Sequence, residues 1–167
     1  MTMLRLALAL ALLPLPALAQ STGSAQTPQL NLRPGSLSPA DPQAIVDAMQ
    51  KLGYRAELTT DDQGDPKIKS AASGANFSVY FYGCTSGKDC TSIQFSAGFD
   101  TDKGLDMQVA NDWNTKKRYG KVYLDDERDP YIEMDVNMEG GIPNALFEDN
   151  LSIWDRMLAD FQTHIDW

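Results

Sequence analysis

Residues Val109–Val136 read VANDWNTKKRYGKVYLDDERDPYIEMDV, and this stretch decides the fold. Its first part predicts the end of a helix, because apolar side chains recur every four residues and therefore share one helical face. These positions are Leu105, Val109 and Trp113. We expect the helix to begin at Asp102, whose carboxylate can accept from the free N–H groups of the first turn. Gly120 can adopt the left-handed conformation that ends a helix.

The second part of the stretch predicts an antiparallel pair of strands. Residues 121–124 and 131–137 alternate apolar and polar side chains, which is typical of a sheet with one buried and one wet face. The polar turn 125–130 joins them. Pro130 cannot donate a ladder hydrogen bond, so we place it at the start of the second strand.

This unit resembles the YbjN family, which is described as a family of bacterial sensory transduction regulators. The resemblance rests on Asn111-Asp112-Trp113-Asn114, on Arg118 to Asp125 and on Pro130 to Val136, and it extends over about Pro42 to Trp167. It implies a fold similar to that of type III secretion chaperones, and it brings no catalytic residues. A leader peptide and a cysteine pair distinguish this chain from cytoplasmic members.

The rest of the chain predicts further helices and strands around this unit. Asp41-Pro42 opens a helix that Gly53 closes, and a long helix begins at Pro143 or Asn144. Four strands are expected at 54–59, 67–70, 77–84 and 91–99. The order is α-β-β-β-β-α-β-β-α. We therefore predict an α+β fold, with a mainly antiparallel sheet and the helices on one of its faces.

Strand periodicity predicts which side chains enter the core. The expected inward positions are Ala56, Leu58, Ile68, Phe77, Val79, Phe81, Ile132 and Met134. Trp113 and Trp154 lie on the apolar stripes of their helices, so both are predicted to be core residues. The opposite sheet face is expected to display Tyr80 and Tyr82 beside Ser92, Gln94 and Ser96.

The first 19 residues predict a secretory signal peptide. Arg5 supplies an early positive charge, residues 6–13 form an apolar run, and Ala17-Leu18-Ala19 is a small-x-small cleavage motif. The run is too short to span a bilayer, and two prolines interrupt it. We therefore expect a periplasmic or secreted protein, cleaved after Ala19, whose mature chain does not insert into a membrane.

The composition of the chain limits the classes of partner it can bind and indicates its domain organisation. Cleavage would take one arginine and no acid from 14 basic and 23 acidic residues, which leaves a formal charge of −10. This balance argues against binding nucleic acid or anionic lipid through bulk charge. Residues 20–39 are rich in Ser, Gln, Thr, Gly and Pro, so they predict a disordered linker, with Leu30, Leu32 and Leu37 as positions at which a short segment could dock instead. Residues 40–167 then form one domain.

The two cysteines flank a predicted hairpin loop. Cys84 and Cys90 enclose five residues, and a hairpin can bring such neighbours within bridging distance. An oxidising compartment favours a structural disulfide. The alternatives are a redox pair, which usually has two intervening residues, and half of a metal site, which lacks nearby ligands.

No catalytic, cofactor-binding or metal-binding residue is predicted. The chain lacks a glycine-rich phosphate loop and a nucleophile elbow, and its one histidine, His164, lies at the edge of a helical stripe. The acidic turn 125–129 lacks the twelve-residue calcium-loop pattern, so a solvated hairpin turn is the favoured interpretation. Glu133 and Asp135 share one strand face, and we interpret them as solvating it rather than as a hydrolytic pair.

These observations favour a non-enzymatic, chaperone-like binding or regulatory module that recognises a protein or peptide. The alternatives are a small hydrolase or divalent-metal-dependent enzyme that uses the acidic turn, and a passive envelope-stability protein. Tyrosine combines a large contact area with a polar tip, so Tyr80 and Tyr82 are the predicted centre of a partner site or a homodimer contact. The alternatives are that both tyrosines only support cross-strand pairing, and that the last helix crosses over and covers them.

Overall fold

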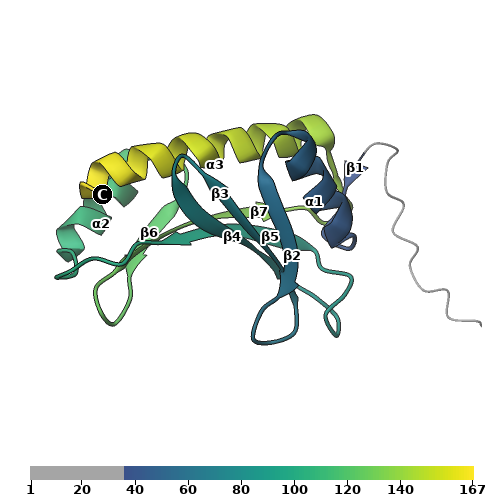
Figure 1. The fold of residues 1–167 in the computed structure, drawn as a ribbon, viewed down its shortest axis with the longest axis horizontal. Helices are drawn as coiled ribbons and strands as arrows, with labels where there is room; N and C mark the ends of the chain where they lie inside the picture. Colours follow the sequence, from purple (N-terminus) through teal and green to yellow (C-terminus); the bar gives the residue numbers. More distant parts are fainter. Residues whose placement is uncertain (1–35) are drawn as a thin grey trace, which may run out of the picture.

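Six antiparallel strands form one sheet, and three helices lie against one of its faces (Figure 1). The computed structural model describes residues 36–167. The strand order across the sheet is β2-β3-β4-β5-β7-β6. The strands are β2 Arg55–Thr60, β3 Pro66–Ala72, β4 Ala75–Tyr82, β5 Ser92–Gly98, β6 Lys121–Leu124 and β7 Pro130–Asn137. The α+β class and the placement of the helices on one face are as predicted.

The first and last helices begin where the sequence indicates. In α1, Pro42–Lys51, the Asp41 carboxylate accepts a hydrogen bond from the Ala44 N–H at 3.1 Å, and proline occupies the first helical position. The last helix, α3, spans Asn144–Ile165 and runs along the inner face of the sheet (Figure 1). Both starts agree with the sequence-based prediction.

The predicted start of the middle helix was wrong. Helix α2 spans Met107–Lys116, and its N-cap is Asp106, which accepts from the Gln108 N–H at 2.8 Å, whereas Asp102 lies outside the helix. The preceding segment is held to the β6–β7 turn, because the Leu105 N–H donates to the Arg128 carbonyl at 2.9 Å. A tertiary contact therefore moves the helix start by more than one turn.

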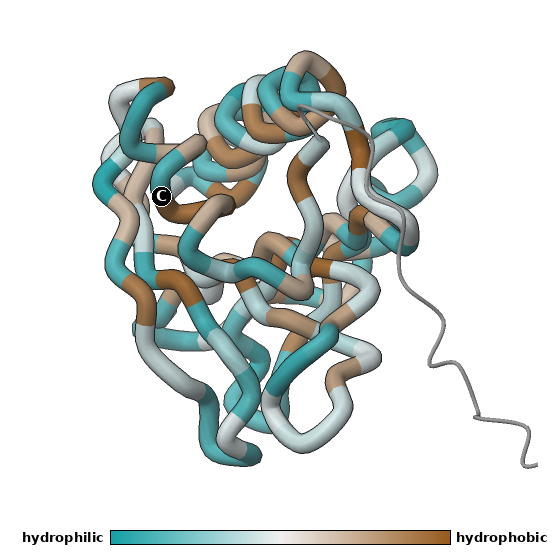
Figure 2. The backbone as a smooth tube through the Cα atoms, turned by 90° about the vertical axis from the view of Figure 1, so that its right-hand side faces the viewer, coloured by the Kyte–Doolittle hydropathy of each residue, from teal (hydrophilic) through white to brown (hydrophobic). Residues whose placement is uncertain are grey.

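Aromatic side chains form the centre of the core between the helices and the sheet. Trp154 of α3 packs against Phe77 and Phe95, with ring centroids 5.6 Å apart in both pairs. Trp113 of α2 packs edge-on against Phe161 at 5.1 Å. Both tryptophans are 1% exposed or less, as predicted. Hydrophobic positions recur at intervals along the strands and α3, while the hairpin loops are mostly hydrophilic or neutral (Figure 2).

The strand periodicity predicted the inner face with one exception. Of the eight expected inward side chains, seven are buried. Leu58 is 40% exposed, although its register partner Ile68 is fully buried. Strand β2 is an edge strand, and the helices leave Leu58 partly open there.

A small second sheet lies beside the start of α3. Strand β1, Ser36–Leu37, pairs with β8, Ile142–Pro143, and Leu37 is buried. Leu37 thus docks into the core, which is the alternative that the sequence left open for this part of the predicted linker. The signal peptide and the rest of the predicted linker lie outside the described residues.

The cysteine pair closes the β4–β5 hairpin. Cys84 and Cys90 form a disulfide across the loop, as predicted. The Thr85 N–H donates to the Lys88 carbonyl at 2.6 Å inside it, and the Thr91 N–H donates to the Tyr82 carbonyl at 3.0 Å beside the strand ends. The bridge therefore fixes the end of the two central strands.

Candidate functional site

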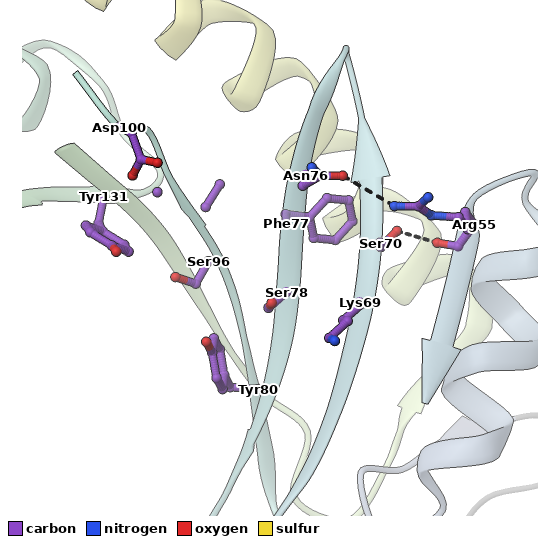
Figure 3. Close-up of a pocket in the computed structure, with 12 residues that line it drawn as sticks. Arg55, Lys69, Ser70, Asn76, Phe77, Ser78, Tyr80, Ser96, Asp100 and Tyr131 are labelled. Carbon is purple, nitrogen blue, oxygen red and sulfur yellow. Dashed lines mark hydrogen bonds between the residues drawn. The ribbon is translucent and has the colours of Figure 1, made fainter. Parts of the chain in front are cut away.

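The sheet face away from the helices carries a hollow of about 500 Å³. We call it the outer hollow. Its lining comes from β2, β3, β4, β5 and β7 and from Asp100, two residues after β5: Arg55, Lys69, Ser70, Asn76, Phe77, Ser78, Tyr80, Ser96, Ala97, Gly98, Asp100 and Tyr131. In Figure 3, Arg55 and Lys69 lie on one side, Tyr131 and Asp100 on the other, and Ser78 and Ser96 between them. Strand pairing alone brings these distant residues together.

Small residues form the floor of the outer hollow. Ser78 and Ser96 are direct register partners on β4 and β5. Gly98 is the register partner of Tyr131 on β7. A Cβ at Gly98 would lie 2.5 Å from Cε1 of Tyr131, so a larger residue would push the ring away. Glycine at this position therefore leaves room for the Tyr131 ring beside β5.

Tyr131 forms one aromatic wall. Its ring stacks on Tyr123 of β6, with centroids 5.3 Å apart and planes at 11°. Burial, then the negative charges of Asp125 and Asp100, raises the pKa of the Tyr131 phenol. The ring therefore stays neutral at physiological pH and presents an apolar face with a polar tip.

The two tyrosines predicted from the sequence have different positions. Tyr80 lines the outer hollow, and the Lys67 ammonium lies 4.5 Å from its ring centroid. Tyr82 lies farther along β4, is 46% exposed, and its hydroxyl is 3.4 Å from Oε1 of Gln94. The structure thus places Tyr80, but not Tyr82, among the residues that line the hollow.

The expectation that Gln94 and Ser96 lie open on this face was wrong. They are 7% and 8% exposed, respectively. Both lie on β5, which has β4 on one side and β7 on the other. The Gln94 amide donates to Asp135 of β7 at 2.9 Å. Alternation along one strand cannot reveal this burial, because it depends on the strands that flank β5.

The acidic pair on β7 is part of a polar network rather than free in solvent. Glu133 accepts from the Lys121 ammonium at 3.0 Å and from the Tyr123 hydroxyl at 3.1 Å. Asp135 accepts from Gln94. Each carboxylate therefore stabilises a neighbouring strand.

The carboxylates at the two ends of the acidic turn accept hydrogen bonds from backbone N–H groups. Asp125 accepts from the N–H groups of Glu127 and Asp129 at 3.0 and 2.9 Å. Asp129 is 8% exposed and accepts from the N–H and hydroxyl of Thr101 at 2.7 and 2.8 Å. The turn was expected to be solvated, but these two acids have structural roles. This geometry does not favour metal binding by the turn.

Residues 36–167 contain no group of three or more His, Cys, Asp or Glu side chains placed to hold a metal ion. His164 packs beside Trp113, and its Nε2 lies 2.9 Å from the Val109 carbonyl oxygen. Within the same range, no helix has the length and apolar character needed to cross a bilayer.

Alkaline pH is expected to reveal the Tyr123–Glu133 contact. Burial, then the Glu133 charge and hydrogen bond, raises the pKa of Tyr123 from 10.0 to about 12. The unfolded chain loses this proton near pH 10 while the folded chain keeps it, so the contribution is intact below pH 10 and is lost as the pH rises to about 12. Because Tyr123 is 41% exposed, we expect a loss on the order of 1 kcal/mol.

Ultraviolet titration at tyrosinate wavelengths measures this effect. Wild-type protein should show a late-titrating tyrosine that Tyr123→Phe lacks, and the variant should lose less stability between pH 10 and 12. An identical titration curve for the two proteins would contradict the contact.

Sequence reasoning missed most of the outer hollow. Arg55, Lys69, Gly98 and Asp100 carried no motif. The available signal was their outward register on expected strands, but their grouping depends on strand order, which the sequence alone did not supply.

Comparison with protein families gives one match. The family model for YbjN, described as "Putative bacterial sensory transduction regulator", matches residues 41–167. No match was found among curated proteins or among solved structures. The matched range takes in all three helices and the entire six-stranded sheet. The chain therefore belongs to the YbjN family.

Proposed function

We propose that this protein is a non-enzymatic binding module of the periplasm or of the secreted fraction, which recognises a protein or peptide through the outer hollow. One observation carries the proposal: a hollow of about 500 Å³, with aromatic walls and a floor of small residues, lies on the sheet face that the helices leave open. Sites that bind ligands are typically concave and combine apolar walls with a few placed polar groups.

Two further features support a binding role over catalysis, and two others support export. The family is described as a regulator of sensory transduction. The carboxylates Asp125, Asp129, Glu133 and Asp135 all accept hydrogen bonds within the fold. The exported location is supported by the leader-like residues 1–19 and by the Cys84–Cys90 disulfide.

Photo-crosslinking at the hollow tests this function. A benzophenone amino acid placed at position 80 should capture a partner in cells that produce the full chain. The matched control is the same amino acid at Tyr119, which is 44% exposed and lies in the segment between α2 and β6. Capture at position 80 but not at position 119 is the expected result.

The double variant Tyr80→Ser/Tyr82→Ser tests the predicted tyrosine pair with a chemical crosslinker. We expect it to keep the wild-type circular dichroism spectrum, because the inner face is unchanged, and to lose the crosslinked partner. A folded double variant that captures the partner at wild-type yield would place the site elsewhere.

A further inference from the structure

The cations of the outer hollow are not neutralised within the described chain. Lys69 is exposed and makes no ion pair or hydrogen bond among residues 36–167. Glu57 is its register partner on β2, yet no ion pair joins them. The Arg55 guanidinium makes one contact, to the Asn76 amide oxygen at 3.3 Å, which leaves most of its donors free. Lys121, on the same face, is instead paired with Glu133.

An unpartnered hydroxyl opens into the same hollow. Ser96 is 8% exposed as a residue, and its hydroxyl has no hydrogen-bond partner among the described residues. This oxygen is not one of the fully buried unpartnered atoms of the described chain, so it is open to the hollow, where a ligand atom or water can bond to it. Ser78 places a second hydroxyl directly across the strand pair, also without a partner in the described chain. Two hydroxyls beside two free cations suit the oxygens of an anion.

The aromatic walls of the outer hollow suit a ligand that carries apolar groups beside its anionic group. Tyr80 and Tyr131 present ring faces on different sides of the serine floor (Figure 3). The ring of Tyr131 is fixed by its stack on Tyr123 and by the space above Gly98. Ring faces bury apolar or aromatic side chains. A ligand that fills the hollow therefore joins an anionic group to apolar neighbours.

The charges that line the outer hollow also indicate which kind of polypeptide could occupy it. Residues 1–35 of this chain contain Arg5 and Arg33 and no acid, so they do not match the side of the hollow that Lys69 and Arg55 form. The carboxylate of Asp100 lies on the opposite side of the hollow, beside Tyr131 (Figure 3). A polypeptide with carboxylate side chains beside apolar ones has the required chemistry.

We propose that the outer hollow binds an extended acidic segment of a partner polypeptide. A Glu or Asp carboxylate faces Lys69 and Arg55 and accepts from Ser78 and Ser96, while an apolar neighbour packs on Tyr80 or Tyr131. This inference rests on the proposed function and specifies the chemistry of the ligand at that site.

Fluorescence anisotropy with three end-blocked heptapeptides tests it. The probes share the frame Ser-Gly-X-Phe-X-Gly-Ser, with X as Glu, Gln or Lys. We expect the Glu peptide to bind about tenfold more tightly than the Gln peptide at low salt, since charge-assisted hydrogen bonds are about twice as strong as neutral ones. The preference should shrink as salt screens the charges.

Single variants test whether the preference for the Glu peptide arises in the outer hollow. Lys69→Met should abolish the preference for Glu, and Ser96→Ala should weaken binding of the Glu peptide several-fold. Lys103→Met removes another exposed lysine that does not line the hollow, and it should not change binding of the peptides. Circular dichroism confirms that each variant is folded.

Each other outcome overturns the inference in a recognisable way. Equal binding of the three peptides, with capture at position 80 intact, would leave the proposed function and reject the acidic ligand. Loss of both would reject both. Competition by inorganic phosphate or acetate at the molarity of the Glu peptide would identify a small-anion site. A dimer that Lys69→Met dissociates, with no peptide binding, would identify a second copy as the occupant.

Discussion

Replacing Trp154 by alanine is expected to lower the free energy of unfolding by about 3–5 kcal/mol. The indole is completely buried and lies against Phe77 and Phe95, so the substitution opens a cavity where α3 meets two central strands. At a urea slope of about 2 kcal/mol/M, the midpoint should fall by roughly 2 M. Far-UV circular dichroism measures this without depending on tryptophan fluorescence.

Two further variants show whether the loss of stability comes from the buried ring of Trp154. Trp154→Phe should cost clearly less, because it keeps most of the ring and removes an indole N–H that has no partner among the described residues. Trp167→Ala is the control, since Trp167 is 58% exposed and should shift the midpoint little. An unchanged midpoint in Trp154→Ala would mean that the ring does not contribute to the core.

Trp113→Ala is expected to lower the free energy of unfolding by a similar amount to Trp154→Ala, because the Trp113 ring is 1% exposed.

Removing the disulfide is expected to cost about 2 kcal/mol, because the bridge closes a short loop and restricts the unfolded chain accordingly. The double variant Cys84→Ser/Cys90→Ser should therefore unfold at lower urea concentration than the wild type. Reductant should lower the wild-type midpoint to near that of the variant and should leave the variant unchanged.

Alkylation without reductant gives a direct test of the same bond. Mass spectrometry of wild-type protein should show no alkylated cysteine, and prior reduction should make both Cys84 and Cys90 reactive. Two alkylated cysteines in unreduced protein would show that the bridge does not form.

Local patterns predicted the elements well where neighbouring residues set the conformation. Asp41 and Pro42 start α1 because a capping carboxylate and a fixed proline φ act within one turn. Phe77, Val79 and Phe81 are buried because side chains alternate along any strand. Asp102 failed as a helix start because a contact between Leu105 and Arg128, distant in sequence, holds that segment in another conformation.

The sequence by itself determined the α+β class, the inner face of the sheet and the cysteine pairing, because periodicity and short loops are local properties. Tertiary structure alone decided the outer hollow. Its cations come from β2 and β3, its hydroxyls from β4 and β5, and Tyr131 from β7, so the site exists only once the strand order is set. The Gln94–Asp135 hydrogen bond and the position of the Tyr131 ring beside Gly98 likewise depend on side chains from adjacent strands, which no single-strand pattern contains.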